Sequence, residues 1–262
     1  MTEGMKVSVI TPSLNQALFI EHTILSVKSQ SYPNIEHIVI DGRSTDETIQ
    51  ILKKYHHLIW LSEPDKGQPD AINKGFKLAS GDIIAWLNSD DLYEPNIMSS
   101  VVHEFKNDTA IDMIYGNCNY IDESDKVLFA YIPPSFNLKR LINSCYNYIP
   151  QPTVFYKKSV LQEMGLLDTN YSYAFDYDFF IRMGQKYRIK KVDLTLASYR
   201  KHSLTKTEKE ILKMRKESLL IGKKYSTGLN VVLHFNYLLG NAYYYNPIIK
   251  NLLRKFRWKF LK

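Results

Sequence analysis

Two adjacent carboxylates, Asp90-Asp91, follow an apolar run at residues 83–87. Adjacent carboxylates repel each other unless a cation lies beside them. Mg²⁺ and Mn²⁺ are held by one or two carboxylates together with substrate phosphates, and such an ion neutralises the charge on a phosphate leaving group. The pair therefore predicts a divalent metal beside a phosphorylated ligand. A solvated turn without a ligand is the alternative.

Another carboxylate, Asp41, ends the apolar run at residues 35–40. In that position it is suited to accept hydrogen bonds from a uracil or thymine imide, or from a ribose. Asp46 follows five residues later, and for Asp46 we favour the simpler role of capping a helix, to which Ser44 is also suited. Asp41 is therefore a candidate nucleoside ligand, with capping as the alternative.

Asp176 lies among aromatic residues in the segment Ala174-Phe175-Asp176-Tyr177-Asp178. Apolar neighbours raise the pKa of a carboxyl group and make it a better general base toward an acceptor hydroxyl. Asp178 is placed to cap the helix predicted at residues 179–186. Helix capping alone is the alternative explanation of this cluster.

Basic side chains add candidate contacts to a charged ligand. Lys66 and the helix start near Asp70 are placed to face a phosphate or a base, although a capped loop explains the same residues without a ligand. A neutral His202 is a candidate metal ligand, and Arg200 is a candidate partner of a pyrophosphate. A surface position is the alternative for His202.

The apolar patterning predicts a scaffold that brings these distant segments together. Strands are predicted at residues 6–11, 35–41, 59–62 and 83–87, and helices at residues 18–30, 70–79 and 96–105. Such alternation predicts a parallel sheet with helices on both faces, and ligands bind beyond the carboxyl ends of its strands. The polar clusters at residues 11–13, 41–44 and 88–91 should therefore meet at one edge of the sheet.

The pattern changes after residue 111. Residues 113–121 and 127–132 predict a hairpin, residues 152–156 and 189–194 predict strands, and residues 159–164 and 178–186 predict helices. We expect this half to complete the sheet and to supply the acceptor side of the site.

Composition limits the class of protein. The chain has 262 residues, of which 45% are hydrophobic, enough for one sizeable α/β domain and an extension. Cys118 and Cys145 have no metal-type spacing, which predicts a reduced, cytoplasmic compartment. The first apolar run, residues 7–10, is too short for a signal peptide. No stretch approaches the ~18–20 apolar residues that span a bilayer.

Taken together, these segments resemble glycosyltransferase family 2, whose members have the GT-A fold. The resemblance covers about residues 6–207 and rests on motifs that occur in the order expected for the family. They are VSVITPSLN (7–15), IDGRSTD (40–46), DKG with AINKG (65–75), GD leading to WLNSDD (81–91), QPTVF (151–155) and FDYD (175–178).

The resemblance implies a fold and a reaction. The fold is α/β of the GT-A type: a Rossmann-like, mostly parallel sheet flanked by helices, with a helical C-terminal appendage. The reaction is transfer of a sugar from a nucleotide diphosphate sugar, with UDP as the expected carrier, to a hydroxyl of a saccharide or lipid-linked acceptor in cell-surface polysaccharide or glycolipid synthesis. One in-line displacement inverts the anomeric carbon, and Mg²⁺ or Mn²⁺ stabilises the departing nucleoside diphosphate.

The resemblance also implies roles for the matching residues. Asp90 and Asp91 lie at the ribose, metal and diphosphate, and Asp176 deprotonates the acceptor. The expected substrate-binding residues are Thr11, Pro12, Asn15, Asp41, Ser44, Asp65, Lys66, Asn73, Asn88, Asp90, Gln151 and Arg200. The expected metal ligands are Asp90, Asp91 and His202. Many family members have Asp where this chain has Asn88, so which acid contacts the ion directly stays open.

The C-terminal extension, residues 208–262, is basic. From Lys201 onward the chain has 14 Lys and Arg against three Glu, a balance of +11, whereas the first 200 residues carry −4. Residues 248–262 have the pattern of an amphipathic helix with flanking cations, which suits an anionic membrane such as the inner face of the cell membrane. Docking on a second subunit is the alternative. Residues 1–207 would then form the catalytic domain.

Three other functions agree less well with the sequence than glycosyl transfer does. A sugar-phosphate nucleotidyltransferase usually has a glycine-rich loop after the first strand, and residues 12–16 contain no Gly. A catalytically inactive sugar-nucleotide-binding protein would have lost Asp90, Asp91 or Asp176, and all three are present. A nucleic-acid-binding protein would leave the acidic edge of the sheet unexplained, so we expect no nucleic acid partner.

Overall fold

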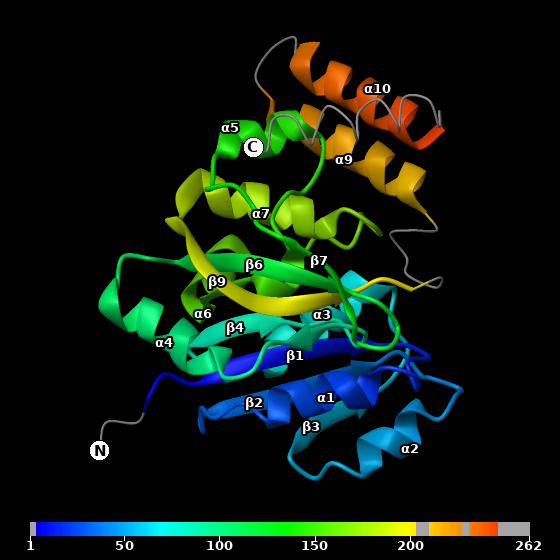
Figure 1. Cartoon of the computed structure of the whole chain (residues 1–262), viewed down its shortest axis with the longest axis vertical. Helices are drawn as coiled ribbons and strands as arrows, with labels where there is room; N and C mark the ends of the chain where they lie inside the picture. The colour runs from blue at the N-terminus through cyan, green and yellow to red at the C-terminus, as the bar shows by residue number, and fades with distance from the viewer. Residues whose placement is uncertain (1–3, 203–209, 227–230, 246–262) are drawn as a thin grey trace.

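The structure is a computed structural model, and it describes residues 4–202, 210–226 and 231–245 (Figure 1). Four parallel strands form the first half of the sheet in the order β3-β2-β1-β4. These strands are β1 (Val7–Ser13), β2 (Ile35–Asp41), β3 (Leu58–Ser62) and β4 (Ile83–Trp86). The helices between them are α1 (Ile20–Lys28), α2 (Thr48–Lys53) and α3 (Gln68–Leu78). The predicted parallel unit is confirmed.

The second half of the sheet is mixed rather than parallel. From β4 it continues through β8, β6 and β9 to β5, while β7 pairs with β6, and β8 runs antiparallel to both of its neighbours. The strands are β5 (Leu92–Tyr93), β6 (Met113–Ile121), β7 (Val127–Tyr131), β8 (Phe155–Lys157) and β9 (Ile189–Arg200). The helices are α4 (Ile97–Asn107), α5 (Leu138–Ser144), α6 (Lys158–Met164), α7 (Phe175–Lys186), α9 (Ile211–Tyr225) and α10 (Val231–Tyr245).

Helices cover both faces of the sheet, as the patterning predicts. Side chains of α3, α6 and α7 form one core with the inward residues of β1, β2 and β4. Side chains of α1, α2 and α4 pack on the opposite face. Gly75 lets α3 approach β1 closely, since a Cβ there would lie 2.3 Å from Ile10 Cγ2. This packing fixes the sheet edge from which the functional loops emerge.

Several predicted elements differ from those observed. The strand predicted at residues 152–156 is observed as β8, but it begins later, at Phe155, because Gln151–Thr153 form a 3₁₀ turn, which suits a proline that cannot donate to a strand ladder. The strand predicted at residues 189–194 extends to Arg200, paired to β6 in parallel. Helix α5 was not predicted. The helix predicted at residues 248–262 lies outside the described residues. No helix in the described segments is long and apolar enough to cross a membrane.

The described part of the C-terminal extension packs onto the preceding domain. Helix α9 contacts α5 and α7, and α10 contacts α5 and α9 (Figure 1). Ile221 of α9 is fully buried in the core that also contains α7. Figure 1 shows α9 and α10 beside α5, on the opposite side of the sheet from α1 and α2. The extension therefore shares a hydrophobic core with α7 and the sheet.

Candidate functional site

A cavity of about 700 Å³ opens at the carboxyl ends of β1 and β4. Its wall is completed by the hairpin of β6 and β7, the start of α7 and one side of α9. The predicted convergence of strand ends is confirmed, because Ser13 pairs with Asp41 in the β1–β2 register and β4 pairs with β1 on the other side. The predicted site residues that line the cavity are Pro12, Asp65, Asn88, Asp90, Gln151, Asp176 and His202.

Asp90 and His202 form a pair at the cavity wall. Asp90 Oδ2 lies 3.0 Å from His202 Nε2, although the two residues come from the loop after β4 and the end of β9. The His202 ring also packs against Phe19, with ring centroids 4.8 Å apart. These two residues bring a carboxylate oxygen and an imidazole nitrogen together at the cavity wall.

Asp91 points away from the cavity. Its carboxylate is buried and accepts hydrogen bonds from the Arg200 backbone N–H at 3.0 Å and from Asn88 Nδ2 at 3.1 Å. Burial, together with the nearby charge of Asp90, raises the pKa of Asp91 well above its usual range. The position of Asp91 differs from the predicted direct metal contact, because its oxygens are used within the protein.

Arg200 also lies outside the cavity wall. Its guanidinium is fully buried, donating to the backbone carbonyl of Asp90 at 2.9 Å and pairing with Asp125 of the β6–β7 turn. It lies 4.8 Å above the ring of Phe19. This position differs from the predicted pyrophosphate contact, since the guanidinium joins the β6–β7 turn to the loop that carries Asp90.

Asn88 is the centre of a small amide network. Its Nδ2 donates to Asp91 and to Gln151 Oε1, and its Oδ1 accepts from Gln68 Nε2 at 2.8 Å. Gln151 in turn donates to the carbonyl of Trp86 at 2.7 Å. An aspartate at position 88 has no N–H to donate, and it would place a second negative charge beside the buried Asp91. The network gives a physical reason for Asn at this position.

Asp41 and its neighbours lie behind the cavity wall. The buried Asp41 carboxylate accepts from the backbone N–H and hydroxyl of Ser44 and from the hydroxyl of Ser62. Ser44 Oγ accepts from the Asn15 backbone N–H at 2.7 Å, and Asn15 Oδ1 accepts from the Thr45 backbone N–H at 2.8 Å. These contacts tie together the loops after β1, β2 and β3. Asp41, Ser44 and Asn15 are not among the cavity-lining residues.

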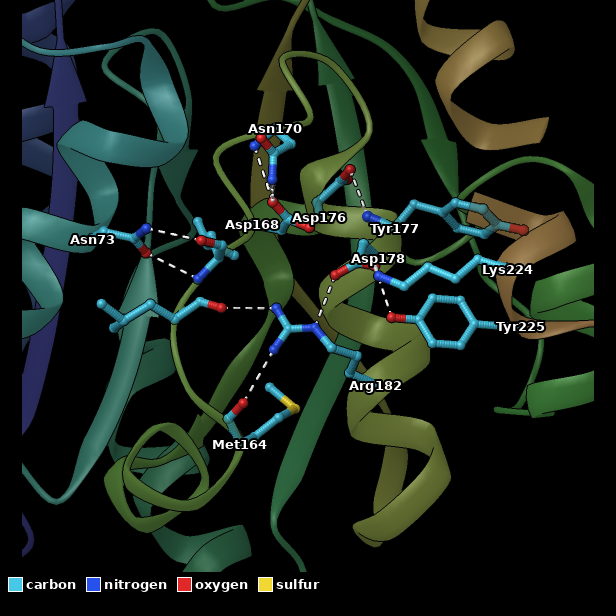
Figure 2. Close-up of polar contacts among 12 residues, drawn as sticks. Asn73, Met164, Asp168, Asn170, Asp176, Tyr177, Asp178, Arg182, Lys224 and Tyr225 are labelled. Atoms are coloured by element: carbon cyan, nitrogen blue, oxygen red, sulfur yellow. Dashed lines mark hydrogen bonds and ion pairs between the residues drawn. The ribbon is translucent and has the colours of Figure 1, made fainter. Parts of the chain in front are cut away.

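The other residues predicted to bind the nucleotide sugar do not all reach the cavity. Asp65 lines the cavity and accepts from the Gly67 backbone N–H at 2.8 Å, whereas Lys66 is exposed outside the cavity wall. Thr11 is buried and its hydroxyl lies 2.9 Å from His37 Nε2. Asn73 exchanges two hydrogen bonds with the backbone of Leu167 (Figure 2). Thr11 and Asn73 therefore use their polar atoms within the protein rather than in the cavity.

Asp176 lies at the start of α7, on the cavity wall. Its Oδ2 accepts from Asn147 Nδ2 at 2.7 Å, and its Oδ1 accepts from the Tyr177 backbone N–H at 2.8 Å. Burial raises the pKa of the Asp176 carboxyl, and these hydrogen bonds oppose the rise. The charge of Glu217 raises it further. A raised pKa makes a carboxylate a stronger base toward a hydroxyl.

Sequence reasoning missed two groups of cavity residues. Aromatic side chains from separate strands and loops line the cavity, and they include Tyr120, Phe129, Tyr146 and Tyr199. The side chains of Ile211, Met214 and Ser218 bring α9 into the wall. The alternation of aromatic and small residues in 127–132 signals one lined face, but no sequence signal places α9 at the cavity.

The described residues contain no group of three or more His, Cys, Asp or Glu side chains able to hold a metal ion. Cys118 and Cys145 are buried free thiols, and burial raises the pKa of Cys145 to about 11. Any ion at this site would therefore be shared between the Asp90–His202 pair and a ligand. The cysteines have no part in it.

Known proteins match the chain in sequence and in structure. The family model described as Glycosyl transferase family 2 matches residues 8–165. An uncharacterized glycosyltransferase of Mycobacterium tuberculosis is 32% identical over 187 residues, covering 70% of each chain. TarS of S. aureus aligns with a TM-score of 0.66 at 20% identity, over 93% of this chain and 44% of its own. The mannosyltransferase PcManGT of Pyrobaculum calidifontis aligns with a TM-score of 0.64 at 16% identity, over 100% of this chain and 82% of its own.

Proposed function

Because the chain belongs to glycosyltransferase family 2 and has the GT-A fold, we propose that it transfers a sugar from a nucleotide diphosphate sugar to a hydroxyl group of a saccharide or lipid-linked acceptor. UDP is the proposed carrier. The observation that carries the proposal is that Asp90 and Asp176, which are distant in the sequence, line the same cavity. Asp90 is available to hold a metal ion at the leaving diphosphate, and Asp176 is available to take the proton of the acceptor hydroxyl.

The donor occupies the half of the cavity formed by the ends of β1 and β4. Pro12, Ser13 and Asn88 line this half, together with Gln68 at the start of α3. Asp41 supports it from behind by holding Ser44 and Ser62 in place. Structures of TarS in complex with UDP-GlcNAc and of PcManGT in complex with GDP-Man and Mn²⁺ support a nucleotide sugar as the ligand of this fold.

The Asp90–His202 pair fits Mg²⁺ or Mn²⁺ as part of a shared site. Carboxylate oxygens suit both ions, and an imidazole nitrogen favours Mn²⁺. Two protein ligands leave coordination positions for the diphosphate oxygens, in keeping with the mode in which such ions bind through one or two side chains and substrate phosphates. When bound, the ion neutralises the charge of the departing nucleoside diphosphate. Asp91 supports the pair from the protein interior through Arg200 and Asn88.

Asp176 acts on the acceptor. Its carboxylate takes the proton of the acceptor hydroxyl while the hydroxyl oxygen forms a bond to the anomeric carbon of the donor sugar. The bond between that carbon and the diphosphate oxygen breaks in the same step, so the configuration at the anomeric carbon inverts. Asn147 holds Asp176 Oδ2 by a hydrogen bond of 2.7 Å and orients the carboxylate toward the cavity.

The extension brings this cavity to a membrane surface. Helix α10 exposes Val231, Val232, Phe235 and Leu238, and the sequence after Glu217 contains no Asp or Glu. An apolar helix face in a cationic segment is attracted to anionic lipid. We place the protein on the inner face of the cell membrane, where lipid-linked acceptors reach the side of the cavity lined by α9.

A screen of sugar nucleotides for thermal stabilisation, with and without Mn²⁺, tests the function. At 100 times its Kd a donor stabilises the fold by about 2.7 kcal/mol, which raises the Tm of a chain of this size by about 5–10 °C. We expect one donor to give a shift that requires Mn²⁺ and that Asp90→Asn abolishes. Asp193→Asn, a change at a carboxylate that is 85% exposed, is the matched control. If no donor shifts the Tm, or if Asp90→Asn shifts like the wild type, the proposal is wrong.

A further inference from the structure

Strand β3 is an open edge of the sheet. It pairs with β2 on one side, and no other described strand pairs with it on the opposite side. Helix α2 packs on one face of β3, beside Leu58 and Trp60, whereas α3 packs on β1 and β2. Figure 1 shows β3 at the end of the molecule opposite α9 and α10. The free edge of β3 is therefore a surface that the proposed reaction does not use.

The strand itself lacks the features that usually protect an edge. Leu58–Ser62 contains no charged residue and no proline. Ile59 and Leu61 are 47% and 39% exposed. Both lie on the face that α3 covers farther inward, because their register partners Ile38 and Ile40 pack in the core formed with α3. An apolar edge strand without charges, prolines or bulges is a template for pairing with another strand.

The backbone of β3 determines which residues face the free edge. The Glu63 N–H donates to the last carbonyl of β2 at 3.0 Å. Because backbone groups alternate between the two sides of a strand, Leu58, Trp60 and Ser62 direct theirs away from β2. The Leu58 N–H is already bonded to the Tyr55 carbonyl at 3.1 Å. The N–H groups of Trp60 and Ser62, and the carbonyls of all three residues, therefore face the free edge.

A second β3 strand, running antiparallel, matches these groups in one register. With Trp60 opposite the partner's Trp60, the two residues exchange N–H and carbonyl groups, as a hydrogen-bonded pair does. Ser62 then lies opposite the partner's Leu58, so its N–H meets the carbonyl of Leu58. The Leu58 N–H, which is bonded to its own turn, is not needed. The edge is thus complementary to itself in its backbone.

The side chains favour the same register. Ile59 lies opposite the partner's Leu61, and such apolar pairs across two strands stabilise a sheet. A shift by two residues in one direction would place Leu61 opposite the partner's His57. A shift in the other direction would place Ile59 opposite the partner's Glu63. Only the register centred on Trp60 pairs both exposed apolar residues with each other.

The charges beside β3 favour an antiparallel pair as well. Residues 53–57 contain two Lys and no acidic residue, whereas residues 63–70 contain three acidic residues and one Lys. In an antiparallel pair the basic start of one strand lies beside the acidic end of the other. Glu63 already pairs with Lys74 at 2.8 Å. The complementary charges therefore orient the two copies rather than form a new ion pair.

We propose that the chain forms a two-fold dimer through β3, with the strands antiparallel and Trp60 at the axis. The partner is a second copy of the chain because the edge is its own complement in backbone groups, apolar side chains and charge. A contact that uses the same surface on both copies closes after two. The dimer leaves α10 of each copy at the opposite end of the molecule (Figure 1).

Sedimentation velocity of the full chain over a wide range of protein concentration tests the dimer. We expect a shift from monomer to dimer with no larger species. Ile59→Lys should weaken dimerisation by at least about 100-fold, because each copy would bury an ammonium group against an apolar side chain. Leu220→Lys is the matched control, since Leu220 is 53% exposed on α9. It should dimerise like the wild type, and circular dichroism checks that both variants are folded.

Cysteine crosslinking tests the register by a separate route. A chain with both Ile59→Cys and Leu61→Cys should form a covalent dimer under mild oxidation, because the Cα atoms of a non-hydrogen-bonded pair lie close enough for a disulfide. Either single variant should crosslink slowly, since identical residues are then diagonal to each other and about 7–8 Å apart. The native Cys118 and Cys145 are buried.

Three results would overturn the proposal. They are a wild-type chain that stays monomeric at every concentration, an Ile59→Lys variant that dimerises like Leu220→Lys, and single cysteine variants that crosslink as fast as the double variant. Species larger than a dimer that Ile59→Lys removes would also overturn it, because a two-fold contact cannot extend beyond two copies.

Discussion

Asp176 combines partial access to a cavity with surroundings that disfavour its charged form. Burial raises the pKa of its carboxyl, and Glu217 adds to the rise through its negative charge. Asn147 and the Tyr177 backbone N–H hold the two oxygens by hydrogen bonds. A carboxylate whose pKa is raised in this way accepts a proton from a hydroxyl more readily than an exposed aspartate does. The same surroundings make the rate depend on pH in a predictable direction.

We predict that Asp176→Asn lowers transfer by about 10²–10⁴-fold, the usual contribution of a general base. In the wild type the rate falls as pH drops through the pKa of Asp176, because only the carboxylate acts as a base. Since that pKa is raised, the fall begins at a higher pH than the ordinary aspartate value of 3.8. A profile of kcat/KM against pH measures this fall, which forms the acidic limb of the profile. Asp176→Asn should abolish the acidic limb.

Donor binding is the control for that variant. The donor-dependent rise in Tm should be the same in Asp176→Asn as in the wild type, because the proposed role of Asp176 is to act on the acceptor and not to bind the donor. A loss of donor binding, or a residual rate with the same acidic limb, would contradict the assignment of Asp176 as the base.

At the scale of elements, α9 holds the start of α7 from outside the sheet. The Glu217 carboxylate of α9 accepts the backbone N–H groups of Ser172, Tyr173 and Ala174 at 3.0, 2.8 and 2.9 Å. Further along α9, Lys224 and Tyr225 bond to the fully buried Asp178 (Figure 2). Asp176 lies between these two anchors. The extension therefore positions the proposed base.

We predict that Glu217→Ala lowers kcat by about 10- to 100-fold, because the loop before Asp176 loses the acceptor of three N–H groups and small misplacements at a reacting centre are costly. Glu217→Gln retains an acceptor oxygen and should be milder. It also removes a negative charge near Asp176, so the acidic limb of its pH profile should move to lower pH. A purely structural role would leave that limb unchanged.

Glu210→Ala at the N-cap of the same helix is the matched control, since among the described residues the Glu210 carboxylate forms an i,i+3 ion pair with the exposed Lys213 and no hydrogen bond or ion pair with α7. It should leave kcat and the pH profile as in the wild type. Glu217→Ala should also leave the donor-dependent Tm shift intact. Equal effects of the two variants on kcat would exclude a positioning role for Glu217.

The sequence predicted the elements whose pattern is local. Strands β1, β2 and β4 are mostly apolar segments that lead into polar residues, so both their existence and the meeting of their ends followed from the sequence pattern. The 3₁₀ turn at Gln151–Thr153 and the antiparallel pairing of β8 did not, because antiparallel and parallel partners leave the same apolar pattern in a short strand.

Site residues were predictable where a short segment decides their position, after a strand for Asp90 and at a helix start for Asp176. Asp90 and Asp176 line the cavity, but the sequence could not distinguish Asp90 from its neighbour Asp91, whose carboxylate is turned inward by Arg200. Which of the two carboxylates faces the cavity depends on Arg200, which is far away in the sequence. The role of Glu217 was invisible for the same reason, since its partners are backbone N–H groups that carry no sequence signal.

At the scale of the whole molecule, a buried histidine links stability to pH. His37 of β2 is buried beside Thr11, and burial lowers its pKa to about 3. The unfolded chain binds a proton at this residue near pH 6.5, whereas the folded chain does not. Stability is therefore full above pH 6.5 and falls below it. We predict a loss of about 1.4 kcal/mol per pH unit from this residue.

Denaturant unfolding between pH 7.5 and 5 measures the effect. His37→Gln cannot titrate, so its free energy of unfolding should change less steeply with pH than that of the wild type, whatever its value at pH 7.5. His103→Gln, a change at an exposed histidine of α4, is the control and should keep the wild-type slope. A steep slope that persists in His37→Gln would assign the pH dependence to other groups.

The charge distribution also separates the chain into a mildly acidic part, residues 1–200, and a basic part from residue 201 onward. Residues 246–262 hold six Lys and Arg and no acidic residue. A second copy of the chain would bring like charges together at this segment, whereas each cation near an anionic lipid surface contributes about 1 kcal/mol. At such a surface the exposed apolar residues of α10 would add a contact that does not depend on charge.

We predict that the full chain sediments with vesicles containing phosphatidylglycerol and that deletion of residues 246–262 releases it, while the donor-dependent Tm shift is unchanged. Salt should weaken binding of the full chain, because the lost contribution is electrostatic. Phe235→Glu, on the exposed face of α10, should weaken binding at high salt as well. Vesicle binding that survives the deletion would refute the membrane assignment of the tail, and a dimer lost on deletion would show that the segment joins two copies of the chain instead.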